Sequence, residues 1–162
     1  MVIRNDLKGI RGWLILLALN VMVLPVAFGL QITGTLLPLL MDGTFAYLAN
    51  PNSEGYFPEA AMVIIAEISI IAALVLGSLY VCYLFFAHHY KFPIYFIAFL
   101  LAAIALLIGD CYLAHWAFPE DPLYDNETQA QLIKSFISLP TYMIYLSVSK
   151  RVKATFVEGR PS

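Results

Sequence analysis

Residues 61–72, AMVIIAEISIIA, decide the fold class, because they place a single carboxylate, Glu67, inside a continuous apolar run. The run belongs to an apolar window over residues 60–86, and crossing the hydrocarbon core of a bilayer takes about 20 helical residues. A charge that faces lipid in such a helix costs about 2.5–3.5 kcal/mol on insertion scales. The stretch therefore predicts a transmembrane helix whose Glu67 faces the interior of a helix bundle.

The composition of the whole chain agrees with a membrane protein. Of its 162 residues, 61% are hydrophobic and 12% are charged, whereas soluble domains carry about 25% charged residues. Three further apolar windows cover residues 12–30, 93–118 and 128–149, and the last is the weakest because it contains Lys134. We predict an all-α integral membrane protein, a bundle of four transmembrane helices that forms a single domain over residues 1–162.

The Lys and Arg residues, with the exception of Lys134, fall on one side of the predicted bundle. They precede the first window, lie between the second and the third, or follow the fourth, whereas residues 31–59 and 119–127 contain none. Cytoplasmic loops of membrane proteins carry an excess of Lys and Arg. We therefore expect both termini in the cytoplasm, residues 31–59 as a long apolar outer loop, and residues 150–162 as a basic cytoplasmic tail.

Three ionisable residues on three windows reach a similar depth below the outer surface. Glu67 and Asp110 lie about seven residues from the outer ends of antiparallel helices, roughly 10 Å deep, and Lys134 enters on the fourth window. Stripes of small residues on the second and third windows permit close packing, which turns both acids inward. Asn20 and Gln31 mark a weaker polar line on the first window. The predicted buried polar cluster consists of Glu67, Asp110, Lys134, Ser138, Thr141 and Tyr145.

Three interpretations of this cluster stay open. Lys134 can pair with one acid or extend to the outer surface, so that the cluster only joins the helices. The cluster can instead form a proton or cation site, or a polar pocket open to the outer side. Glu67 and Asp110 can also form a catalytic pair, but the chain has no HExxH, GxSxG or phosphate-binding loop, so no catalytic residue is assigned. The Cys and His residues lie too far apart along the predicted bundle to share a ligand, so no metal and no cofactor are expected.

Basic and aromatic residues at the predicted cytoplasmic surface are candidates for contact with membrane lipids or with a partner protein. Anionic headgroups attract each nearby Lys or Arg by about 1 kcal/mol, so we expect lipid contact and no binding of nucleic acid. The residues are Arg11, Trp13, Lys150, Arg151 and Lys153.

Several motifs follow one another along the chain. They are GIRGWL at residues 9–14, the acid of the second window, FF at 85–86, the acid of the third window, and YLSVSKRVKATFV at 145–157. With them the chain resembles a family of small bacterial four-helix inner-membrane proteins catalogued as domain of unknown function 2569. The resemblance implies a multi-pass protein of the bacterial cytoplasmic (inner) membrane, and it supplies neither an activity nor catalytic residues.

The residues favour a non-enzymatic membrane module that binds a membrane-protein partner, a second copy of itself or lipid. Nearly the whole chain is predicted to lie in the membrane, and its cytoplasmic end is distinctive. The first alternative is a small transporter, or a subunit of a proton- or cation-coupled permease, that uses Glu67 and Asp110. The second is an interfacial enzyme that acts on a lipid-linked substrate, and it depends on the acid pair alone.

Overall fold

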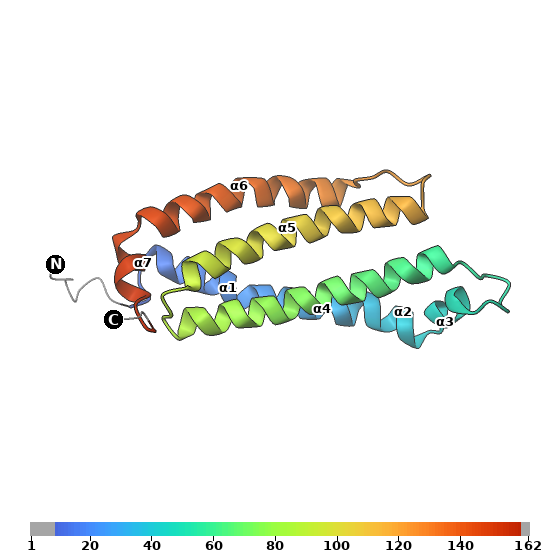
Figure 1. Ribbon diagram of the computed structural model, residues 1–162, viewed down its shortest axis with the longest axis horizontal. Coiled ribbons are helices and arrows are strands. Elements are labelled where there is room, and N and C mark those ends of the chain that lie inside the picture. The colour runs from blue at the N-terminus through green and yellow to red at the C-terminus, as the bar shows by residue number, and fades with distance from the viewer. Residues whose placement is uncertain (1–8, 160–162) are drawn as a thin grey trace.

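The computed structural model describes residues 9–159, and helices make up most of this range. In chain order the elements are α1 (Trp13–Gln31), the π-helical turn η2 (Ile32–Leu36), α2 (Leu37–Met41), α3 (Thr44–Ala49), α4 (Pro58–Phe86), α5 (Phe92–Ala117), α6 (Asn126–Val148) and α7 (Lys150–Thr155). The long helices run side by side, with α3 towards one end of the molecule and α7 at the other (Figure 1). We call these the α3 end and the α7 end.

Three helical segments are long and apolar enough to cross a membrane. They are Trp13–Met41, Pro58–Phe86 and Phe92–Ala117, with 29, 29 and 26 residues. At about 1.5 Å per residue, each can span a hydrocarbon core of about 30 Å. Their outward faces carry large apolar side chains such as Leu76 and Ile94, which are 69% and 71% exposed. A surface of this kind suits lipid, so the structure indicates a membrane protein.

The fourth predicted span is a helix, α6, but among residues 9–159 it does not belong to the segments apolar enough to cross a membrane. Its first half carries Glu127, Gln129, Gln131 and Lys134. These polar side chains lower its average hydropathy well below that of the other long helices. The hydropathy of α6 therefore does not by itself identify a fourth membrane crossing.

Residues 31–59 are not simply the loop that the sequence predicts, because α1 continues without a break through η2 and α2 to Met41. In η2 the N–H of Leu37 donates to the carbonyl of Ile32, five residues earlier, so the helix widens without ending. Gly43 then reverses the chain with a φ of 85°, a conformation that glycine adopts without strain. The apolar side chains of residues 32–41 thus lengthen the first membrane segment, and α3 packs back against α4.

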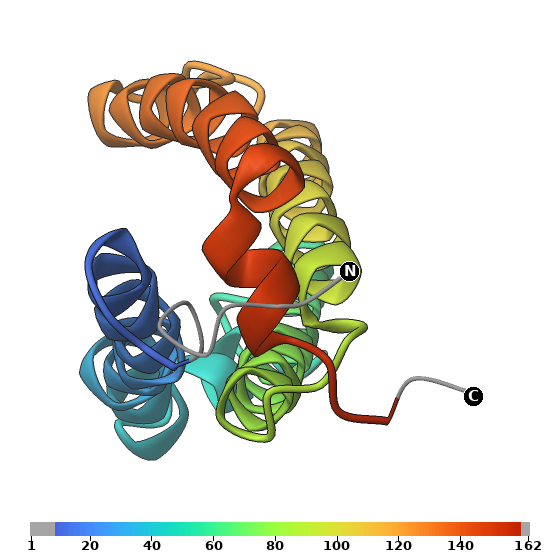
Figure 2. The same ribbon diagram turned by 90° about the vertical axis from the view of Figure 1, so that its left-hand side faces the viewer.

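The long helices form an open arc when the molecule is seen from the α7 end (Figure 2). α1 packs against α4, α4 against α5, and α5 against α6. α1 and α6 stand at the two ends of the arc, and within residues 9–159 they form no extended contact with each other. The bundle therefore has a concave side between α1 and α6, and α7 lies across that side at one end.

The buried core lies in the half of the bundle next to α7. Phe85, Phe92 and Phe96 have no exposed surface, and Phe156, which follows α7, stacks on Phe92 with ring centroids 4.6 Å apart. The same cluster contains Leu14, Leu17, Ala18, Val21, Val81, Leu84, Leu146 and Val152. Close packing of this kind stabilises helix association in a membrane, and it closes the interior of the arc at the α7 end.

Candidate functional site

A cavity of about 360 Å³ lies between α1, η2, α4, α5 and α6, on the concave side of the arc. It is separate from the aromatic core at the α7 end, since none of the residues Phe85, Phe92 and Phe156 lines it. Its polar lining consists of Gln31, Thr35, Glu67, Asp110, Gln131, Ser135 and Ser138. The remaining lining is apolar, including the rings of Phe28 and Phe99, which meet edge to face at 6.4 Å.

The two acids that the sequence singles out, Glu67 on α4 and Asp110 on α5, both line this cavity. Each is partly buried, and the Oδ1 atom of Asp110 is buried without a hydrogen-bond partner among residues 9–159. The lining contains no Lys or Arg side chain from the part of the chain that the structure describes. Two carboxylates thus share one cavity that holds no protein cation to balance them.

Two polar side chains at the junction of α1 and the π-helical turn η2 also line the cavity. Gln31 ends α1, and Thr35 follows within the turn, so both contribute to the part of the cavity wall that the first membrane segment supplies. A π-helical turn changes the direction of side chains relative to a regular α-helix, and such turns occur often at functional sites. The sequence indicated Gln31 through its weak polar line, but it gave no sign of the turn or of Thr35.

On α6 the side chains that line the cavity are Gln131, Ser135 and Ser138. They stand at positions i, i+4 and i+7, which share one face of a helix. The Ser135 hydroxyl donates to the carbonyl of Gln131 at 2.8 Å, and the Ser138 hydroxyl donates to the carbonyl of Ser135 at 3.2 Å. Because these hydrogens are engaged by the backbone, the two hydroxyl oxygens can act towards the cavity only as acceptors.

Three members of the predicted polar cluster lie outside the cavity. Lys134 is exposed, because it precedes Ser135 by one residue and therefore points about 100° away from the cavity face. Thr141 is exposed and donates to the carbonyl of Ile137 at 2.9 Å. Tyr145 packs against the aromatic core at the α7 end. The structure brings Glu67, Asp110 and Ser138 together, and it places the inward face of α6 one position later along the chain than the sequence suggested.

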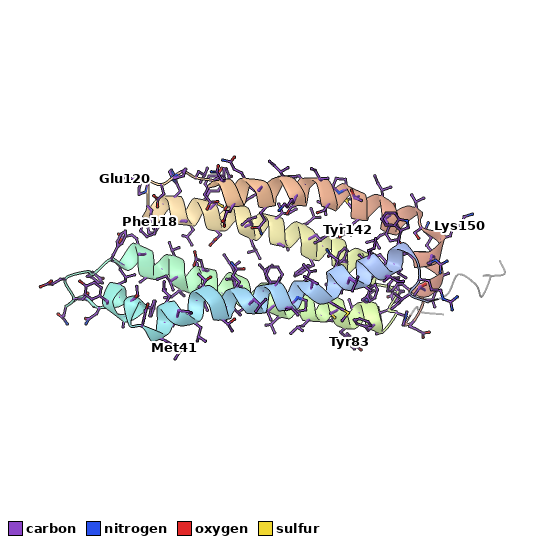
Figure 3. All side chains as sticks on the ribbon, turned by 180° about the vertical axis from the view of Figure 1, so that it is seen from behind. Met41, Tyr83, Phe118, Glu120, Tyr142 and Lys150 are labelled. Carbon is purple, nitrogen blue, oxygen red and sulfur yellow. The ribbon has the colours of Figure 1, made fainter. Side chains whose placement is uncertain are left out.

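The residues predicted to meet lipid or a partner gather at the α7 end. Lys150 lies at the corner between α6 and α7 (Figure 3), and Lys150 and Lys153 are exposed. The partly buried Arg151 has a buried Nη1 atom without a hydrogen-bond partner among the described residues. At the start of α1, Arg11 is exposed and Trp13 is 75% exposed. These side chains form a basic and aromatic rim around the packed core.

The segment after α7 is tied to the turn between α4 and α5 by backbone hydrogen bonds. The N–H of Tyr90 donates to the carbonyl of Glu158 at 3.0 Å, and the N–H of Glu158 donates to the carbonyl of His88 at 3.2 Å. With Phe156 in the core, these bonds fix α7 across the end of the bundle. In the part of the chain that the structure covers, no three His, Cys, Asp or Glu side chains are placed to hold a metal ion.

At the opposite end, Asp125 starts α6. Its Oδ1 accepts the N–H of Thr128 at 2.7 Å, as the first residue of a helix cap does. Hydrogen bonds from the side chain and the backbone of Thr128 hold the pKa of Asp125 below its ordinary value of 3.8. The capped end fixes where α6 begins.

Comparison with known proteins found no match among curated proteins and none among solved structures. One family does match, under the description "Protein of unknown function (DUF2569)", and the match covers residues 7–157. This range includes every helix of the structure and every residue that lines the cavity. The chain therefore belongs to the DUF2569 family.

Proposed function

We propose that the protein is a non-enzymatic module of the bacterial inner membrane that binds a cation in the cavity between α1, α4, α5 and α6. The composition of the cavity lining carries the proposal: it contains two carboxylates, Glu67 and Asp110, and no Lys or Arg. A carboxylate away from water needs a positive partner or a proton. Because the described lining offers no positive side chain, a bound cation would be the partner of these acids when they are ionised.

The proposal includes four membrane crossings, with α6 as the fourth. α6 packs against α5, and its 23 residues span roughly 35 Å at the standard rise. Its polar side chains Gln131, Ser135 and Ser138 line the cavity and so are turned away from lipid. Intramembrane polar groups usually face the interior of a bundle in this way, which explains why α6 is the least apolar of the long helices.

The α7 end is proposed to lie in the cytoplasm, with both termini. The turn that carries Lys91 lies at this end together with the basic residues of α7 (Figure 1). The connections at the other end, residues 42–57 and 118–125, contain no Lys or Arg. The positive-inside bias then assigns the α7 end to the cytoplasm and the cavity to the outer half of the membrane.

Transport is the second candidate function, and the position of the cavity favours it. The cavity lies on one side of a tightly packed core, so a bound cation is open to the outer half and separated from the cytoplasm by Phe85, Phe92 and Phe156. A site closed on one side is the arrangement that alternating access requires. Passage would need the core to open, and flux of the bound cation through proteoliposomes would distinguish a transporter from a binding module.

The rim at the α7 end is proposed to bind anionic lipid headgroups. α7 buries Val152 while Lys150 and Lys153 stay exposed, so the helix presents its charges at the surface. Added phosphatidylglycerol should raise the thermal stability of the wild-type protein in neutral detergent. A Lys150→Gln/Lys153→Gln variant should show a smaller rise, and an equal rise would contradict this contact.

Equilibrium dialysis of the purified protein tests the proposed cavity function. The labelled cations are Na⁺, Rb⁺ and alkylammonium ions of different chain length. Saturable binding of at least one of them is expected, and Glu67→Gln or Asp110→Asn should remove it. Glu59→Gln is the matched control, because Glu59 lies on the same helix as Glu67 but does not line the cavity. Unchanged binding in both cavity variants, or saturable binding of no cation, would contradict the proposal.

A further inference from the structure

We propose that the cation bound in the cavity is a primary ammonium group on an apolar chain, and that it reaches the cavity from the membrane between α1 and α6. This inference rests on the proposed function, and it adds the chemical class of the ligand and its route. The hydrogen-bonding character of the lining, its apolar wall and the open side of the arc support it independently.

The lining offers several hydrogen-bond acceptors, beside the side chains of Gln31, Thr35 and Gln131, which can both donate and accept. When ionised, the carboxylates of Glu67 and Asp110 can only accept, and one oxygen of Asp110 has no partner among residues 9–159. Ser135 and Ser138 have already given their hydrogens to α6 carbonyls, at 2.8 and 3.2 Å. A primary ammonium has three donors and no acceptor, so it complements this set. A quaternary ammonium of equal charge has no donor and leaves these acceptors without partners.

The rest of the wall is apolar and suits an alkyl chain next to the charged group. Phe28 and Phe99 form an edge-to-face pair in this wall, and Leu100 and Ile104 extend it. A volume of about 360 Å³ is near the lower end of the range of small-molecule pockets, about 300–1,000 Å³. The cavity can therefore hold a headgroup and the first carbons of a chain, and a longer chain must leave it.

The open side of the arc gives that chain a path into the membrane. α1 and α6 both line the cavity but form no extended contact within the described range. Both helices also carry exposed apolar side chains, such as Leu30 and Ile137, as suits helices that lie in lipid. The core around Phe85 and Phe92 closes the path from the cavity towards the α7 end. An amphipathic amine can thus place its ammonium at Glu67 and Asp110 while its chain stays in lipid.

The ammonium can belong to a phospholipid headgroup or to a free long-chain amine. Lys134 distinguishes these sources, because it is exposed on α6 one residue before Ser135, which lines the cavity. From this position its positive charge can meet the phosphate of an ethanolamine phospholipid, while a free amine has no phosphate to offer. Lys134→Gln should therefore weaken the binding of the phospholipid and leave the binding of the free amine unchanged.

The test uses the full-length protein in nanodiscs of phosphatidylcholine, and it measures binding of labelled decylammonium against free aqueous concentration. Decylammonium should bind at concentrations at least about tenfold lower than decyltrimethylammonium, as expected when hydrogen bonds to a charged group are lost. It should also bind at least about tenfold more tightly than ethylammonium. A Ser135→Ala/Ser138→Ala variant should reduce the ratio between the affinity for decylammonium and the affinity for decyltrimethylammonium. Ser147→Ala is its matched control, since Ser147 also donates to its own helix, at 2.9 Å, but lies outside the cavity.

Each outcome decides a different point. Equal binding of decylammonium and decyltrimethylammonium, or of decylammonium and ethylammonium, overturns the inference and leaves the proposed cation site standing. If no labelled cation binds saturably, both the inference and the proposed function fall. Preferential binding of decylammonium supports the inference. Displacement of decylammonium when phosphatidylethanolamine is included in the discs, reduced in Lys134→Gln, assigns the ammonium to a lipid headgroup; no displacement assigns it to a free amine.

Discussion

Replacing Phe156 by alanine should release α7 from the end of the bundle. Phe156 is 3% exposed, stacks on Phe92 at 4.6 Å and meets Phe85 at 5.5 Å. Truncating a buried Phe to Ala costs about 3–5 kcal/mol. Since about 1.4 kcal/mol corresponds to a factor of ten in an equilibrium constant, the population with α7 detached should rise by a factor between roughly 10² and 4 × 10³. The backbone hydrogen bonds around Glu158 are too few to offset this loss.

Thiol labelling measures that population. A cysteine at Ala154, which is 4% exposed, is placed in a background with Cys82→Ala and Cys111→Ala, and its reaction with a water-soluble maleimide is timed. When α7 detaches and docks again faster than the maleimide reacts, the labelling rate is proportional to the population with α7 detached. Phe156→Ala should therefore raise the labelling rate by at least about a hundredfold. Phe136→Ala is the control, because Phe136 is 59% exposed on α6. A rate that changes no more than in this control would refute the assignment of α7 docking to the aromatic core.

Three further predictions concern other parts of the fold. Gly77→Ala should lower the free energy of unfolding by about 1–3 kcal/mol in detergent titrations, because its Cβ would lie 2.9 Å from an aromatic ring of α5. Gly109→Ala should not lower it, because its Cβ meets nothing within 4 Å and alanine favours a helix interior over glycine. Asp125 has a lowered pKa, so its stabilisation of the start of α6 is present above about pH 3.8 and is lost as the pH falls through the folded-state pKa. Protection of the backbone amides in the first turn of α6 from hydrogen exchange should therefore fall in this pH range in the wild type but not in Asp125→Asn. An impermeant thiol reagent should label Glu54→Cys in intact cells and Lys153→Cys only after lysis, and the reverse pattern would overturn the proposed orientation.

The sequence predicted most of the helical architecture, because long apolar runs indicate membrane helices and the turn residues between these runs indicate where the helices end. An all-α membrane protein follows from composition and window length. The family was recognisable from GIRGWL and the segment around Ser149–Val157, and the match over residues 7–157 confirms it. Residues 31–59 were predicted as an outer loop, whereas the structure continues the first helix through a π-helical turn and α2 to Met41.

The inward face of α6 was also predicted one position away from where the structure has it. Both stripes on this helix are polar: one contains Lys134 and Thr141, the other contains Gln131 and Ser135, and Ser138 lies between them. Periodicity cannot choose between two polar stripes about 100° apart, because each satisfies the same spacing rule. The contact of α6 with α5 makes the choice, and it leaves Lys134 exposed.

By itself, the sequence determined that Glu67 and Asp110 occupy apolar helices, because the identity of a residue and its distance from a helix end are one-dimensional properties. Only the tertiary structure decided that both acids line one cavity with the acceptors of Ser135 and Ser138 and with no Lys or Arg from the described chain. The rotation of each helix about its axis depends on packing with its neighbours, and that rotation places a side chain in a cavity, in the core or in lipid.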